Sequence, residues 1–259
     1  MRVRDALFTG SMVIGLLEDR KTQTRRVMNR LLRFGPITEF GPSDTRGYDW
    51  QFRDKRLLWN DLRHDALLEV LPYQVGDLLY VREAWKTFAC LDKVKPSELP
   101  VNDVSGAGVL YLADGTWRSL SANGERCKCR VREITPIFGR YRPGMHMPRW
   151  ASRITLKVTD VRVQRLQDIS EKDAKAEGVC AWVESQAKYP WGDISDPLRH
   201  LMVKNTFGNA KTAFECLWDS LNGDRNAGIY AWDANPWVIA VSFEVIKANV
   251  DTVLSEVAA

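Results

Sequence analysis

Apolar positions alternate with polar ones over three stretches of the chain, which is the pattern of half-buried β-strands. These stretches are residues 78–85, 151–163 and 237–246. In the second stretch the apolar positions change parity near Thr159 and Asp160. Such a change predicts a β-bulge, a device that barrels use to curve. The pattern therefore predicts three main strands that lie far apart in sequence.

Other stretches show the spacing of amphipathic helices. Residues 11–18 predict a short helix with Ser11 as its N-cap. Residues 213–221 carry a second apolar stripe at helical spacing. A third helix is expected to begin after Ser170, as in a capping box, and to end at Gly178. Helices and strands thus occur in one chain, which indicates a mixed α+β class.

The remaining chain has no sustained period. Residues 20–26 suit an extended segment, whereas residues 29–74 and 89–147 are punctuated by Gly and Pro and are interpreted as insertions. A further helix is expected near residues 57–71. We therefore expect a single domain over residues 1–259, a β-barrel with flanking helices and two long insertions.

Composition limits the class of protein. Hydrophobic residues make up 45% and charged residues 27% of the 259 residues, as in ordinary globular proteins. No apolar run approaches the ~20 residues that span a bilayer, and residues 1–10 lack the apolar stretch of a signal peptide. The sequence thus predicts a cytoplasmic protein without a membrane partner.

The cysteines and nucleotide motifs exclude several kinds of site. Five cysteines at irregular spacing favour free thiols over a disulfide framework. Cys127 and Cys129, with His146 as a third ligand, do not have the spacing of a usual zinc site. The sequence also lacks the glycine-rich motifs of nucleoside-triphosphatases and dinucleotide-binding proteins. We therefore expect no metal and no cofactor.

The positive charge is unevenly distributed, although the net charge is only +4. Residues 20–33 contain six basic residues and no acid, and residues 126–153 contain eight basic residues and one acid, Glu133. Brought together, the two segments would form a surface suited to phosphates. The alternative is two separate solvated faces.

Four stretches together resemble one known family. They are residues 21–26 (KTQTRR), 76–85 (GDLLYVREAW), 146–179, which begins HMPRWASRI and ends EGV, and 235–237 (NPW). In order and spacing they are similar to the ASCH family of PUA-like domains, especially its long members in bacteriophages and prophages. Asp19 and Arg20 stand where that family usually has a glycine and a basic residue.

The resemblance implies a small β-barrel with a cleft beside the first helix. It also implies binding of a modified nucleoside or a nucleic acid, RNA more than DNA. Some small family members are amidohydrolases that act on N4-acylated cytidines with a Lys, a Thr and a Glu. By resemblance these residues correspond to Lys21, Thr24 and Glu83. Another branch of the family cleaves RNA.

The chemistry of these three residues is consistent with amide hydrolysis. Thr24 could supply the nucleophilic hydroxyl, and Lys21 could accept its proton if a dry pocket near Arg25 and Arg26 lowered the pKa of the amine. Glu83 interrupts an apolar row and needs a partner, for which Lys21 is the natural candidate. In a regular strand Lys21 and Thr24 would face opposite ways, so this arrangement requires a bend near Lys21.

A second group of residues is expected to bind the substrate. Basic residues would hold phosphate, two tryptophans could stack a base, and a histidine could contact phosphate or act as an acid: Arg25, Arg26, Arg149, Arg153, Trp85, Trp150 and His146. In one alternative the protein is a non-catalytic RNA- or DNA-binding module in which Glu83 and Lys21 form a structural ion pair. In the other it is a ribonuclease that depends on His146.

Overall fold

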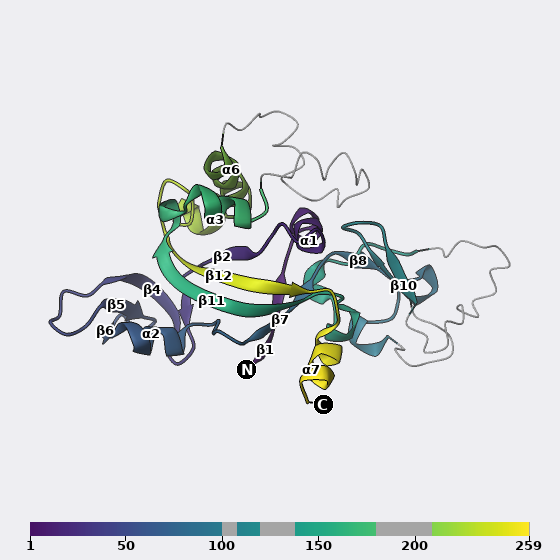
Figure 1. Ribbon diagram of the computed structural model, residues 1–259, viewed down its shortest axis with the longest axis horizontal. Coiled ribbons are helices and arrows are strands. Elements are labelled where there is room, and N and C mark those ends of the chain that lie inside the picture. Colours follow the sequence, from purple (N-terminus) through teal and green to yellow (C-terminus); the bar gives the residue numbers. More distant parts are fainter. Residues whose placement is uncertain (100–107, 120–137, 180–208, 259) are drawn as a thin grey trace.

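A five-stranded sheet forms the centre of the protein (Figure 1). In this computed structural model, which describes residues 1–99, 108–119, 138–179 and 209–258, the strands lie in the order β1, β7, β11, β12, β2. Their bounds are Val3–Leu7, Leu78–Arg82, Thr155–Arg165, Trp237–Ile246 and Gln23–Val27. Strand β1 is parallel to β7, and the other neighbours are antiparallel.

The long strands β11 and β12 are those that the alternating pattern predicts. They pair along almost their whole lengths, and the register shifts between Val158 and Asp160. The predicted bulge is thereby confirmed. The middle of β12, from Val238 to Val241, is buried at every position, so this strand is covered on both faces.

The first predicted insertion forms its own four-stranded sheet. Its strands are β3 (Arg30–Leu31), β4 (Gly35–Pro42), β5 (Trp50–Asp54) and β6 (Trp59–Leu62), followed by helix α2 (His64–Val70). The helix expected near residues 57–71 is thus shorter, because residues 59–62 pair with β5 instead. Phe52 and Leu67 belong to the same buried cluster as Val241 of the central sheet. The insertion therefore shares the main core.

A third, smaller sheet lies at the opposite end of the molecule (Figure 1). It contains β8 (Trp85–Lys86), β9 (Gly108–Tyr111) and β10 (Trp117–Ser119). Six short 3-10 helices connect the described elements: Ala89–Leu91, Pro96–Glu98, Gly144–His146, Arg149–Ala151, Leu166–Asp168 and Arg225–Gly228.

The α-helices lie on both sides of the central sheet (Figure 1). Besides α2, they are α1 (Gly10–Leu17), α3 (Glu171–Ala176), α6 (Ala210–Asn222) and α7 (Val250–Ala258). The Ser170 side chain accepts a hydrogen bond from the Asp173 N–H, so the predicted cap of α3 is confirmed. The predicted cap of α1 is wrong: Thr9 is the N-cap, and its hydroxyl lies 3.0 Å from that of Ser11.

The mixed α+β class is confirmed by this arrangement. The closed barrel is not, because β1 and β2 lie at opposite ends of the strand order and do not pair within the described residues. The PUA-like fold therefore stays a prediction. None of the helices in the described ranges is long and apolar enough to span a membrane.

Candidate functional site

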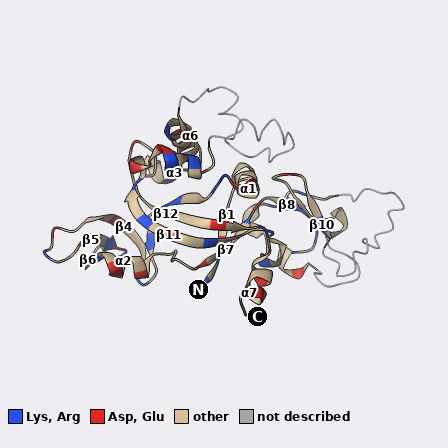
Figure 2. Cartoon of the chain, viewed as in Figure 1, with Lys and Arg blue, Asp and Glu red and all other residues tan. Residues whose placement is uncertain are grey.

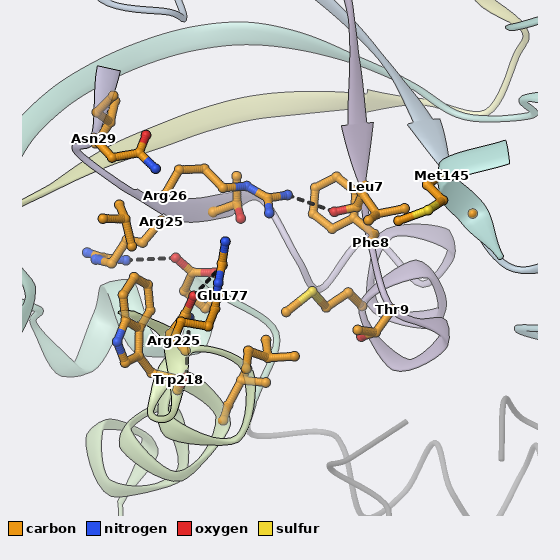
Figure 3. Close-up of a pocket in the computed structure, with 18 of the residues that line it drawn as sticks. Leu7, Phe8, Thr9, Arg25, Arg26, Asn29, Met145, Glu177, Trp218 and Arg225 are labelled. Atoms are coloured by element: carbon orange, nitrogen blue, oxygen red, sulfur yellow. Dashed lines mark hydrogen bonds and ion pairs between the residues drawn. The ribbon is translucent and has the colours of Figure 1, made fainter. Parts of the chain in front are cut away.

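A pocket of about 610 Å³ opens beside α1, β2 and α6 (Figure 3). This volume falls within the range of small-molecule sites in proteins. Much of the wall is apolar or aromatic, formed by Leu7, Phe8, Met12, Tyr73, Met145, Phe214, Leu217 and Trp218 among others. Such a wall suits the flat face of a base or another ring.

Polar residues occupy much of the rest of the wall, and those that carry a charge are mostly basic. These polar residues are Thr9, Thr24, Arg25, Arg26, Asn29, Arg30, Glu177, Asn222 and Arg225. Four of these side chains are guanidinium groups and one is a carboxylate. Figure 2 shows basic residues on β2 and residues of both signs on α3, which contacts β2.

Lys21 is completely buried just behind this wall. Its Nζ donates hydrogen bonds to the backbone oxygens of Gln23 and Glu177, both at 2.9 Å, and to Glu177 Oε2 at 2.7 Å. Desolvation lowers the pKa of Lys21. The nearby Glu177 carboxylate opposes that shift, and the positive charges of Arg26 and Arg25 add to it.

The backbone around Lys21 supplies the bend that the sequence argument required. Asp19 has a φ of +57°, and the Lys21 N–H donates to the carbonyl of Gly15, so the chain reverses before β2 begins. Lys21 consequently lies outside the strand, and the alternation of β2 does not separate it from Thr24. A Cβ at Gly15 or Gly178 would lie 3.3 or 3.1 Å from Lys21 Cβ. Two glycines thus make room for this side chain.

Glu177 connects Lys21 to Arg25. The fully buried Arg25 side chain donates from Nη1 to Glu177 Oε1 at 3.0 Å and to Gln23 Oε1 at 2.6 Å. Its Nη2 lies 3.5 Å from Asp173 Oδ2, and its guanidinium carbon lies 5.7 Å from the centre of the Phe214 ring. Figure 3 shows Arg25 and Glu177 joined on the pocket wall. Arg25 is therefore committed to carboxylates of the protein.

The predicted ion pair between Lys21 and Glu83 is wrong. Glu83 is buried, and its two carboxylate oxygens accept hydrogen bonds from Arg153 Nε and Nη2 at 2.8 and 2.9 Å. Burial raises the pKa of Glu83, while Arg153 opposes the shift. Glu83 is buried with Val81 and Trp85 and does have a partner, as the apolar row required, but that partner is Arg153. Glu83 follows the end of β7 at Arg82, and Arg153 links it to Asp114 near the β9–β10 hairpin.

Most of the other predicted binding residues lie away from the pocket. Trp85 is fully buried and packs edge-on against Trp150 with ring centres 6.4 Å apart, so the expected base stacking on Trp85 is wrong. Arg149 pairs with Asp251, and Arg153 pairs with Glu83 and Asp114. His146 is exposed in the 3-10 helix Gly144–His146 and is not on the pocket wall. Only Arg25 and Arg26 of this group line the pocket.

Three charged wall residues were missed by the sequence analysis: Glu177, Arg30 and Arg225. Glu177 belonged to a stretch that carries the family resemblance, but no periodic pattern places it beside residue 21. Arg30 belonged to the basic run of residues 20–33, and nothing in the sequence set Arg225 apart. Cys127 and Cys129 lie outside the described residues, and the described part of the chain contains no cluster of three potential metal ligands.

Comparison of the chain with family models, with curated proteins and with solved structures found no match.

Proposed function

We propose that the protein binds a modified nucleoside in this pocket and hydrolyses an amide on its base, with N4-acylated cytidine as the substrate class. A PUA-like fold of the ASCH type belongs to the same proposal. The observation that carries it is the buried Lys21–Glu177 pair directly behind a pocket whose wall includes Thr24. Glu177 takes the role that the resemblance assigned to Glu83.

The proposed reaction begins at the hydroxyl of Thr24. Its oxygen attacks the amide carbonyl carbon, and the neutral amine of Lys21 accepts the hydroxyl proton. Lys21 then gives this proton to the departing base nitrogen, leaving the acyl group as an ester on Thr24. Water hydrolyses the ester, which releases a carboxylic acid and restores the hydroxyl.

The surroundings of Lys21 support this role. Burial lowers the pKa of the amine, which increases the fraction that is neutral and able to accept a proton. Glu177 lies 2.7 Å from Nζ and stabilises the ammonium formed during the reaction. Phe8, Phe214 and Trp218 offer apolar surface to the base.

Hydrolysis of N4-acetylcytidine, followed by chromatography, tests the proposal. Thr24→Ala and Lys21→Ala should each lower kcat at least ~100-fold, because the nucleophile or its base is lost. Thr24→Ser should retain part of the activity because it keeps a hydroxyl. Full turnover by Thr24→Ala would contradict the nucleophile assignment.

Two matched controls separate the site from its surroundings. Thr22 is exposed next to Lys21, and Thr22→Ala should leave turnover unchanged. Glu177→Gln should lower kcat, whereas Glu83→Gln should lower stability with little change in kcat of the folded protein. A loss of kcat in Glu83→Gln but not in Glu177→Gln would instead assign the catalytic role to Glu83. Thermal unfolding of each variant identifies losses that come from misfolding.

A second candidate function is binding without catalysis. The observation in its favour is that Lys21 already donates to three acceptors, the full number for an ammonium group. In that case folded wild-type protein binds the nucleoside or an RNA strand but produces no cytidine. The ribonuclease alternative has less support, because His146 does not line the pocket.

A further inference from the structure

The pocket carries more positive charge than its own carboxylates balance. Arg25 contacts the carboxylates of both Glu177 and Asp173, and Glu177 also contacts the buried Lys21. The charge of Arg25 is thus balanced by carboxylates of the protein. Three further basic residues of the wall lie outside this group.

Arg26, Arg30 and Arg225 line the same pocket, and no ion pair joins any of them to a carboxylate of the described ranges. Arg26 Nη2 donates to the backbone oxygen of Leu7 at 2.8 Å, and Arg225 Nη1 donates to Asn222 Oδ1 at 2.9 Å. Both acceptors are neutral. Three guanidinium groups that repel one another around one pocket favour an anionic ligand.

The segment that presents Arg225 has an unfavourable backbone. Asn226 and Ala227 have φ values of +51° and +55°, and Gly228 follows with +83°. Consecutive left-handed residues are disfavoured for side chains with a Cβ, and such strain is common at ligand sites.

Contacts on both sides hold this segment in place. The indole N–H of Trp218 donates to the backbone oxygen of Tyr230 at 2.7 Å. The backbone N–H of Trp232 donates to Asp219 Oδ1, also at 2.7 Å. Arg225 therefore reaches the pocket from a segment anchored to α6, while Arg26 reaches it from β2 (Figure 3).

We propose that the ligand of this pocket is a phosphorylated nucleotide, with its phosphate bound by Arg30 and Arg225 at the rim and by Arg26 deeper in the pocket. Arg30 and Arg225 are exposed and Arg26 is half-buried, so their guanidinium groups are accessible to a phosphate ester. Guanidinium groups bind phosphate oxygens in bidentate fashion. The assignment of the base to the apolar wall rests on the function proposed above. A free nucleotide and a nucleotide within a chain offer the same chemistry.

Binding measurements with unmodified ligands test the phosphate site without requiring turnover. Calorimetry would compare cytidine, cytidine 5′-monophosphate, cytidine 3′-monophosphate and a short cytidine oligonucleotide. Wild type should bind at least one monophosphate ~10-fold more tightly than cytidine, because charge-assisted hydrogen bonds form. In the Arg30→Gln/Arg225→Gln double variant this ratio should fall towards one, with the affinity for cytidine unchanged and the remaining preference supplied by Arg26.

Lys55→Gln/Arg56→Gln is the matched control, since it removes the same two positive charges from the exposed β5–β6 turn, away from the pocket. It should leave the ratio unchanged.

Three outcomes would overturn the proposal. They are equal binding of cytidine and both monophosphates by wild type, an unchanged ratio in the double variant, and no binding of any ligand. A phosphate preference shared equally by adenosine and uridine nucleotides would support the phosphate site and contradict the cytidine-directed function. If the oligonucleotide binds most tightly, the ligand of the pocket is a nucleotide within a nucleic-acid strand and not a free nucleotide.

Discussion

At the scale of single residues, Lys21 has the most unusual environment among the predicted site residues. It is fully buried, and desolvation lowers its pKa from the ordinary lysine value of 10.5. In the unfolded chain the amine regains water and its ordinary pKa. Between the two pKa values the unfolded chain holds a proton that the folded protein does not, so the free energy of unfolding rises with pH over this window.

Lys21→Met should remove that contribution. The free energy of unfolding of wild type relative to the variant should increase as the pH rises towards the ordinary lysine value of 10.5. Urea denaturation at a series of pH values measures this difference in free energy of unfolding. The contributions of other titrating groups cancel, because both proteins contain them. Lys95→Met is the control, because the Lys95 side chain is 77% exposed and stays hydrated in both states. A difference for Lys21→Met that is constant with pH would contradict the argument.

At the scale of elements, the end of α3 positions the site. Gly178 follows this helix with a φ of +89° and lies against the Lys21 side chain. The Ser170 cap and the glycine stop of α3 are local signals, and both were predicted from the sequence. The N-cap of α1 is Thr9 and not the predicted Ser11. The strand at residues 59–62 depends on pairing with β5, and there the helix prediction was wrong.

Gly178→Ala and Gly76→Ala form a matched pair. Gly76 has a φ of +85° with nothing within 4 Å of an added Cβ, whereas at Gly178 a Cβ would meet Lys21 Cβ at 3.1 Å. Both variants should lose about 1–2 kcal/mol from backbone strain. Only Gly178→Ala should lose more than this and also lower amide hydrolysis. Denaturant unfolding and turnover assays measure both effects, and equal results for the two variants would refute the role of Gly178.

At the scale of the whole molecule, an aromatic cluster joins the four-stranded sheet to the central sheet. The rings of Trp50 and Trp237 meet edge to face with centres 5.3 Å apart, and Phe40 contacts both. Ile37, Phe52 and Leu67 extend this contact into the main core. The stretch expected to be an insertion wrapped over the core is therefore part of it.

Trp50→Ala should lower the free energy of unfolding by about 2 kcal/mol, because a half-buried ring and its aromatic contacts are lost. Trp59 lies on the same sheet and is 53% exposed, so Trp59→Ala should change the value by less than about 0.5 kcal/mol. Hydrogen exchange of residues 35–62 should increase in the first variant only. Similar exchange in both variants would show that the cluster does not couple the sheets.

The sequence by itself determined the features that depend on neighbouring residues. The alternation of β11 and β12, the bulge near Thr159, the cap at Ser170 and the need for a bend at Lys21 all follow from local patterns. The partners of the charged residues were decided only by the tertiary structure. Lys21 meets Glu177, 156 positions away, because β2 pairs with β12 and α3 packs against β2. Glu83, just beyond the end of β7, meets Arg153, 70 positions away. A buried charge requires a partner, but periodicity does not identify that partner, since it is set by the order of strands in the sheet.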